Sequence, residues 1–352
     1  MLFARNATVE KTLSLFLTAF MLVISSAGCV GSRQSASPSP SAGTMTIVDM
    51  AGREVAIPEH VERVALIYGV TTSYIVALGK ADTLAAATSP SEIFKSAHPV
   101  FANLGIIGRN GGGVDMEALA QLKPDIFFHR ASTVSLLNSV QTMGIPAIGV
   151  TAENQGDITT LLSLLGRIFG AEERAAELTT CYGQILDKAR ELSRNIPPEK
   201  RKKAIFMGTR IGAVANGAMM QSFMIDTAGG INLAKDVPST EIWPVVGTET
   251  IFGWDPDFIF ISNYVTSNYN VETLTSDPAW VDLTAVKEKQ VFRLPSDKDS
   301  WELPGVSSAL GPLWMLSTMY PDKFDRVQLD AEVREFYKKV YNLDVTPELL
   351  GY

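Results

Sequence analysis

Arginines and large flat side chains recur in this sequence just after short apolar runs. In the first half these residues are Tyr68, Arg109 with Asn110, and His129 with Arg130; in the second half they are Arg210, Tyr264 and Trp301, with Trp243 and the pair Met219–Met220 as further candidates. Guanidinium groups pair with carboxylate or catecholate oxygens, and aromatic rings cover flat faces. The mixture favours a bulky ligand that is partly aromatic and partly anionic. Each residue also has a plain structural alternative, which is a surface ion pair for an arginine and core packing for a methionine.

A bare transition-metal site is not favoured by the distribution of histidines. The chain has 3 histidines. Of these, His60 lies in an early turn, His98 precedes a proline, and only His129 follows an apolar run. A zinc or manganese carrier would bring several nitrogen or carboxylate ligands to one point. An axial ligand to haem from His129 or Tyr68 stays open, beside the simpler alternative of a hydrogen-bonded histidine at a strand end.

The elements that must position these residues are strands alternating with helices. Strands are expected at 46–50 and 54–58 (a hairpin), 63–67, 84–88, 104–108, 123–129 and 145–150, and then at 202–208, 255–262 and 290–295. Helical patterns separate most of them, which predicts the α/β class with parallel sheets. In such sheets ligands bind at the carboxyl ends of the strands, where the candidate residues lie.

A long helical stretch divides the two sets of strands. Apolar residues recur at helical spacing from Gly156 to Asn195, with Gly170 as a break, and the second helix, about Glu172 to Arg194, would be about 34 Å long. We therefore expect two Rossmann-like lobes, 46–155 and 196–352, joined by a helical strut at 156–195, with a cleft between them. The alternative is a surface helix of one single domain.

The chain begins with a targeting segment. Arg5 and Lys11 precede an apolar run from Leu13 to Ile24, and small residues follow before Cys29. This resembles a lipoprotein signal at 1–28, with Ser26 where the motif usually has leucine; an ordinary secretory signal cleaved near Ala27 is the alternative. A Ser/Pro-rich tether at 29–45 would then connect a lipid on Cys29, at the outer face of the cell membrane, to the folded body, or the protein would be free in the periplasm. The other cysteine, Cys181, is expected to be a buried apolar residue with no disulfide partner.

Composition and motifs argue against two further classes. The 352 residues carry a net charge of −8, and the longest basic run is Lys200–Lys203, so nucleic acid is not an expected partner. The sequence contains no Gly-x-Ser-x-Gly, P-loop, His-Glu-x-x-His or Cys-x-x-Cys motif, so the usual hydrolase, nucleotide and metalloprotease chemistries lack their residues. We expect a binding protein and not an enzyme, although paired catalytic carboxylates leave no local signature.

Several segments, in this order, resemble the substrate-binding proteins of ABC importers for ferric siderophores, haem and cobalamin. They are TIVDMAGREVAIPEHVERV, MEALAQLKPDIFF, MIDTAGGINLA, TETIFGWDPDFIFI and WVDLTAVKEKQVFRLP, and the resemblance covers Thr46 to Tyr341. It implies two lobes on one rigid helix and a monomer that hands a metal chelate to a permease and its ATPase, with no cofactor of its own. An iron chelate is the expected ligand, and haem or cobalamin are alternatives. From another class, an extracytoplasmic enzyme or surface sensor on this fold also stays open.

The same resemblance implies a role for two glutamates. In that family a glutamate on the rim of each lobe docks against arginines of the permease, and the matching positions are Glu117 and Glu249. Each precedes a Pro-Asp strand start by one short helix. The alternative is that each acidic residue simply stabilises the first turn of its helix.

Overall fold

Two four-stranded parallel sheets form the framework of the protein. The computed structural model describes residues 43–88, 90–108, 113–238, 243–263, 269–295 and 298–352. The first sheet has the order β4-β3-β5-β6 and the second β10-β9-β7-β8. In the first sheet the strands are β3 (Val64–Leu66), β4 (Leu84–Ala86), β5 (Ile126–Arg130) and β6 (Ala147–Val150). In the second they are β7 (Lys203–Met207), β8 (Ile231–Asn232), β9 (Phe258–Ile261) and β10 (Val291–Arg293). The expected α/β class is confirmed.

An antiparallel hairpin precedes the first sheet. Strand β1 (Thr44–Val48) pairs with β2 (Glu54–Pro58), as expected. The carboxylate of Asp49 accepts hydrogen bonds from the guanidinium of Arg53 and from the amide of Gly149 just after the middle of β6. This network attaches the hairpin to the first sheet.

The expectation of a strand at 104–108 is wrong. Gly105 and Gly108 make only isolated bridges, to Ala86 and Val114. At Gly108, φ is +144°, a value that residues with a side chain rarely adopt. The segment is therefore a connection and not a strand.

Helices cover both sheets. In the first half they are α1 (Thr71–Ala77), α2 (Glu92–Ala97), α3 (Met116–Leu122), α4 (Val134–Thr142) and α5 (Gln155–Phe169). In the second half they are α7 (Met220–Thr227), α8 (Thr248–Trp254), α9 (Val271–Ser276), α10 (Thr284–Lys287), α11 (Leu310–Met319), α12 (Arg326–Tyr341) and α13 (Pro347–Leu350). Short 3-10 helices occupy Ala81–Thr83, Pro99–Asn103, Pro198–Lys200 and Val306–Ala309.

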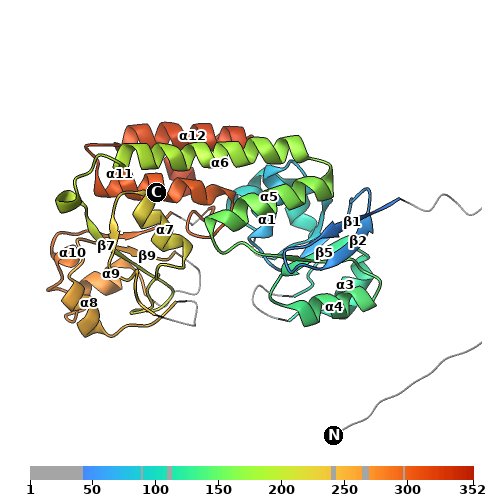
Figure 1. Cartoon of the computed structure of the whole chain (residues 1–352), viewed down its shortest axis with the longest axis horizontal. Helices are drawn as coiled ribbons and strands as arrows, with labels where there is room; N and C mark the ends of the chain where they lie inside the picture. The colour runs from blue at the N-terminus through green and yellow to red at the C-terminus, as the bar shows by residue number, and fades with distance from the viewer. Residues whose placement is uncertain (1–42, 89, 109–112, 239–242, 264–268, 296–297) are drawn as a thin grey trace, which may run out of the picture. The chain divides into compact units, whose positions relative to one another are not determined.

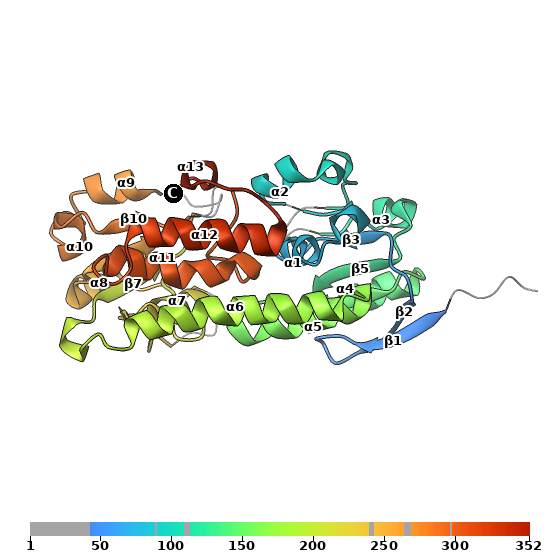
Figure 2. The ribbon, with the colours of Figure 1, turned by 90° about the horizontal axis from the view of Figure 1, so that it is seen from above.

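Helix α6 (Glu172–Ser193) is the long helix expected between the two sets of strands. It follows α5 after Gly170, whose φ of 57° ends that helix in the left-handed conformation. Figures 1 and 2 show α6 running across both halves, and in Figure 2 α11 lies between α6 and α12. Arg174 of α6 donates to the carbonyl of Ala77 at the end of α1 and to those of Lys339 and Val340 at the end of α12. The junction between the halves is thus a layer of helices and not α6 alone.

Side chains alternate between the two faces of each strand. Phe206 and Phe128 point into a core that also contains the buried face of α6, whereas Met207 and Phe127 point into separate cores on the outer faces of their sheets. Both faces of each sheet are buried, which explains why the strands appear in the sequence as continuous apolar runs.

The Pro-Asp strand starts have the same structure in both halves. Helices α3 and α8 end at Lys123 (φ 47°) and Asp255 (φ 41°), each followed by Pro-Asp and then by β5 or β9. The carboxylate of Asp125 accepts the amides of Glu62 and Arg63 before β3, and that of Asp257 accepts the amide of Lys203 in β7. The aspartate therefore fixes the start of the neighbouring strand.

Candidate functional site

Three side chains meet at the carboxyl edge of the first sheet. Tyr68 follows β3, Arg130 ends β5, and Glu153 follows β6. The guanidinium carbon of Arg130 lies 4.2 Å from the centroid of the Tyr68 ring, and Arg130 Nη1 also pairs with Glu153 Oε1. The hydroxyl of Tyr68 donates to the carbonyl of Ala152 at 2.9 Å and to Glu153 Oε1 at 3.2 Å. The structure thus brings together two expected site residues and a third, Glu153, that the sequence analysis missed.

The charged groups of this cluster are exposed to solvent, whereas the tyrosine ring is buried. The side chains of Arg130 and Glu153 are 45% and 47% exposed, whereas Tyr68 as a residue is 3% exposed. Burial raises the pKa of Tyr68, and the nearby carboxylate of Glu153 raises it further. Tyr68 is therefore a neutral hydrogen-bond donor beneath an accessible guanidinium, an arrangement suited to an anionic ligand group.

His129 lies beside this cluster but is mostly buried. Its Nδ1 is 2.8 Å from Thr133 Oγ1, and that hydroxyl donates to the carbonyl of Arg130. Because the hydroxyl proton is used in this way, we assign the Nδ1 atom of His129 as the donor to Thr133. Burial lowers the pKa of His129, and the charge of Arg130 lowers it further. The imidazole is neutral at pH 7.

At the carboxyl edge of the second sheet an indole covers the end of β7. Trp243 has φ of 69°, and its ring lies 5.9 Å from that of Phe206. A Cβ atom at Gly208 would come within 2.7 Å of the indole, so only glycine lets Trp243 lie there. Tyr269, a residue missed by the sequence analysis, donates its hydroxyl to the carbonyl of Gly208 at 2.7 Å. Arg210, two residues further on, is exposed.

Other expected site residues are placed differently. Arg109 with Asn110, Tyr264 and Cys29 lie outside the described residues. Met219 is half-buried at the start of α7, and Met220 is buried in the core, which is the structural alternative considered for it.

Trp301 is a core residue in this structure. Its side chain is fully buried, its indole N–H donates to the hydroxyl of Tyr337 at 2.9 Å, and its ring lies 4.9 Å from that of Tyr352. The indole has no surface free for a ligand, and we remove it from the expected binding residues.

A buried carboxyl group follows Trp301. Glu302 is 2% exposed, and its Oε1 accepts from the hydroxyl of Ser262 at 3.0 Å and from the amide of Asn263 at 3.1 Å, just after β9. Burial raises the pKa of Glu302 to about 7. Nothing in the residues around Glu302 predicts that its carboxyl group lies behind a strand end.

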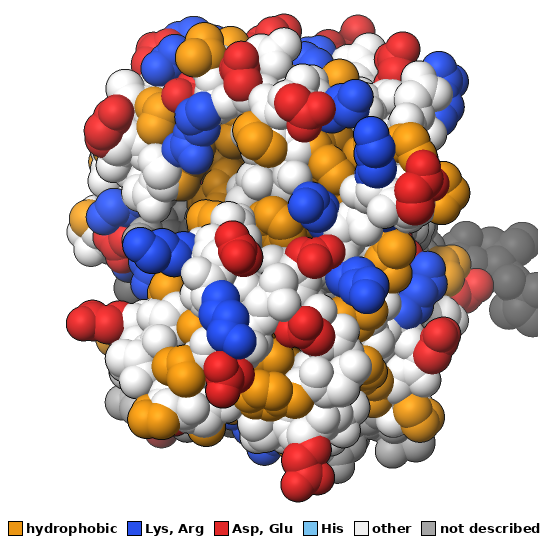
Figure 3. Space-filling view, turned by 90° about the vertical axis from the view of Figure 1, so that its left-hand side faces the viewer, with side chains coloured by type: hydrophobic (Ala, Val, Ile, Leu, Met, Phe, Trp, Pro, Cys, Tyr) orange, Lys and Arg blue, Asp and Glu red, His pale blue; other side chains and the backbone are white. Residues whose placement is uncertain are grey.

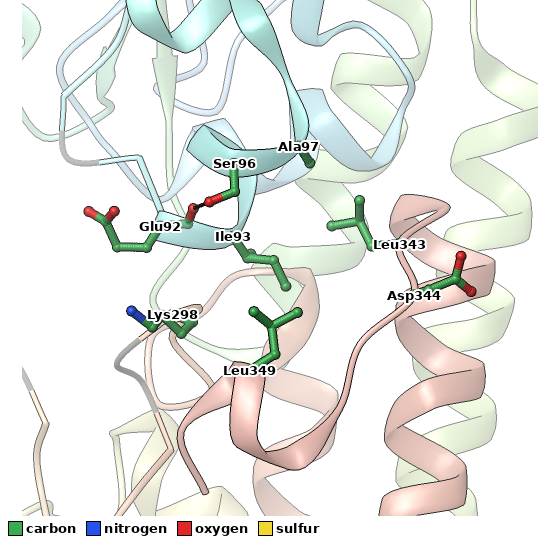
Figure 4. Close-up of a pocket in the computed structure, with 8 residues that line it drawn as sticks. All are labelled: Glu92, Ile93, Ser96, Ala97, Lys298, Leu343, Asp344 and Leu349. Carbon is green, nitrogen blue, oxygen red and sulfur yellow. Dashed lines mark hydrogen bonds between the residues drawn. The ribbon is translucent and has the colours of Figure 1, made fainter.

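A cavity of about 270 Å³ lies between α2 and the C-terminal segment (Figure 4). Apolar side chains form one part of its lining. The charged residues Glu92, Lys298 and Asp344 form another part. The amide of Ile93 donates to the carbonyl of Lys298 at 3.1 Å, so the two halves are joined beside this cavity. The cavity is distinct from the Tyr68–Arg130–Glu153 cluster, none of whose residues lines it.

Glu117 and Glu249 occupy corresponding places in the two halves. Each is exposed and is the second residue of its helix, α3 or α8, ahead of the strand β5 or β9 that lies in the middle of its sheet. Asp115 caps α3 by accepting the amide of Ala118, and Gln121 donates to Glu117. This places one carboxylate on each half at matching positions.

In the part of the chain that the structure describes, no group of three or more His, Cys, Asp or Glu side chains could hold a metal ion. None of the helices described there is both long and apolar enough to cross a membrane. On the face in Figure 3, basic and acidic side chains are interspersed, unlike the continuous basic surface that binds a phosphate backbone.

The chain belongs to the periplasmic binding protein family, whose sequence model matches residues 64–298. A relative is the molybdate-binding protein MolA of Haemophilus influenzae, 22% identical over 329 residues, which cover 86% of this chain and 92% of MolA. The structure of MolA bound to molybdate superposes with a TM-score of 0.75 at 20% identity, over 86% of this chain and 99% of the other.

Two further solved structures share the fold. A periplasmic solute-binding protein of Veillonella parvula has a TM-score of 0.76 at 24% identity, covering 88% of this chain and 96% of the other. CeuE of Helicobacter pylori, in a nickel–histidine complex, has a TM-score of 0.74 at 17% identity, covering 86% and 97%. The expected class of protein is confirmed.

Proposed function

We propose that this protein is the extracytoplasmic binding component of an ABC importer and that it captures an anionic metal complex. The observation that supports this ligand class is the exposed guanidinium of Arg130 held over Tyr68 at the carboxyl edge of the first sheet. In parallel α/β sheets this edge is where ligands bind. An iron chelate of the siderophore kind, whose carboxylate or catecholate oxygens pair with arginine, fits that guanidinium.

A second candidate ligand is a molybdate-like oxyanion. The similarity to MolA over most of both chains favours it, and a tetrahedral oxyanion also pairs with arginine and a neutral hydroxyl. Haem and cobalamin stay as alternatives. Cobalamin is neutral around most of its periphery and would depend on the aromatic residues more than on the arginines.

The remaining parts of the proposal concern delivery. Glu117 and Glu249 dock to the permease, which works with an ATPase. A lipid on Cys29 and the segment that follows it hold the monomer at the outer face of the membrane. We do not propose an enzymatic role, because the family whose sequence model matches this chain is one of binding proteins.

Titration of tryptophan fluorescence against ferric siderophores, molybdate, haem and cobalamin tests the ligand class. Arg130→Ala and Arg210→Ala should each weaken an anionic ligand by roughly 1.5–3 kcal/mol for each charged hydrogen bond lost, and barely affect cobalamin. Saturable binding of none of these compounds, together with tight binding of a bare cation or an amino acid, would overturn the proposal.

A further inference from the structure

Arg130 and Tyr68, the two groups assigned to the ligand, already share one internal acceptor. Oε1 of Glu153 receives both the guanidinium of Arg130 and the hydroxyl of Tyr68. The single proton of the Tyr68 hydroxyl lies closer to the carbonyl of Ala152, at 2.9 Å, than to Glu153. A ligand oxygen that takes the Nη1 donor of Arg130 has to replace the carboxylate oxygen of Glu153. The ligand and Glu153 therefore compete for the same hydrogen-bond donor.

The backbone of Glu153 is fixed independently of this pair. Its amide donates to Asp157 Oδ2 at 2.9 Å, and the same carboxylate accepts the amide and the side-chain nitrogen of Asn154, which caps α5. Asp157 is thus occupied by the capping box and is not a second partner for Arg130. Only the side chain of Glu153 has to move when the pair opens.

The pair is strong enough to compete and weak enough to open. Both side chains are about half exposed, and an ion pair between exposed groups contributes little to stability. A ligand with a single weak acceptor binds Arg130 no more strongly than Glu153 does. Because Glu153 is always present beside Arg130, such a ligand does not displace it. A ligand with two or more anionic oxygens can engage the guanidinium bidentately and displace Glu153.

We infer that Glu153 is an internal counter-ion that selects for ligands with several anionic oxygens by competing with them for Arg130. This inference rests on the proposed function. The ligand class it names is the polydentate anion, such as a tetrahedral dianion or a chelate that exposes paired oxygens. Simple monoanions with one good acceptor are excluded.

The test is a double-mutant cycle with sodium molybdate and a ferric tricatecholate as probes, measured by titration calorimetry on the full chain. Glu153→Gln keeps the size of the side chain and removes its charge. It should raise the affinity for a probe that binds by about two- to fivefold, the range that an exposed ion pair provides. In the Arg130→Ala background the same substitution should change the affinity less than twofold, since the competed group is gone.

The matched control is Asp187→Asn, which removes an exposed carboxylate paired with Arg190 on α6 and should leave both affinities unchanged. Chloride, a monatomic anion that cannot bind a guanidinium bidentately, should compete measurably with the probe in Glu153→Gln and not in the wild type. Thermal melting of each variant checks that it is folded.

The outcomes separate the inference from the function on which it rests. If the probes bind in an Arg130-dependent way and Glu153→Gln does not tighten them, the inference is wrong and the proposed function stands. Tightening of equal size in the Arg130→Ala background would show general repulsion instead of competition, and weaker binding in Glu153→Gln would make Glu153 a ligand contact; both outcomes overturn the inference. If neither the wild type nor any variant binds a probe, the proposed ligand class and the inference both fail.

Discussion

Glu302 makes the stability of the protein depend on pH. Its carboxyl is buried, with hydrogen bonds from Ser262 and Asn263, and Arg293 is the basic group that acts on it. Burial outweighs these contacts and raises the pKa from 4.5 to about 7. Asp299 nearby, which accepts from Ser91, Ser307 and Tyr337, also has a pKa raised by burial.

The sign of the effect follows from proton linkage. Between pH 4.5 and 7 the unfolded chain releases the proton of Glu302 while the folded protein keeps it. The free energy of unfolding should therefore fall as the pH rises through this range, by about 3 kcal/mol if Glu302 acted alone. Urea unfolding at several pH values measures this, and Glu302→Gln should flatten the dependence. An unchanged slope in Glu302→Gln would show that other groups set it.

At the scale of single elements, Arg174 connects three helices. The guanidinium of this α6 residue donates to carbonyls at the C-termini of α1 and α12, where a helix leaves its last carbonyls without partners. Positive charge is also favoured at a helix C-terminus. Arg174 therefore stabilises the point where the two halves meet.

Arg174→Ala should lower the free energy of unfolding by about 2 kcal/mol, because it leaves several half-buried carbonyls unsatisfied. Arg190→Ala on the same helix is the control, since Arg190 pairs with the exposed Asp187 and borders the ring of Phe223. That change should cost less than about 1 kcal/mol. Equal losses for the two variants would argue that Arg174 is an ordinary surface residue.

At the scale of the whole molecule, the helical layer limits how far the halves can move. Helix α6 is joined to α12 through Lys188 and Glu332 as well as through Arg174. Tyr74 of α1 also donates to the carbonyl of Pro304 in the second half at 2.6 Å. We expect ligand binding to change the arrangement little compared with binding proteins that close on flexible crossing strands.

Small-angle scattering of the same preparation with and without ligand measures this change. The radius of gyration should hardly decrease. A large decrease would mean that the helical layer bends or that its contacts break.

The paired glutamates give a second prediction at this scale. Glu117→Lys or Glu249→Lys should reduce transport and leave ligand affinity unchanged, and the double variant should transport less than either. Glu173→Lys, also exposed and in the first turn of a helix, is a control that should transport normally. A fall in ligand affinity together with transport would place the two glutamates in the binding site instead.

The sequence by itself predicted most of the regular framework. Buried strands of a parallel sheet are apolar on both faces, so their positions are visible in the sequence, and Gly170 and Gly79 end helices by taking positive φ. The order of these elements identifies the family, and α6 lies almost where its periodicity predicts it. The prediction of a strand at 104–108 was wrong. Its apolar residues resemble those of a strand, but Gly105 and Gly108 make only isolated bridges. The lobe boundaries at 46–155, 156–195 and 196–352 stay a prediction.

Only the tertiary structure decided which polar groups meet. Tyr68 and Glu153 are 85 positions apart, and Trp301 and Tyr337 are 36 apart. No local pattern tells an exposed indole from one buried against a distant tyrosine, or a solvated glutamate from the buried Glu302. A side chain at a strand end can face the ligand or the core, and the choice depends on which distant elements pack beside it. The sequence therefore determined the edge of the sheet where the site lies, and the packing of distant elements, such as α12 against Trp301, decided which candidate residues are accessible to a ligand.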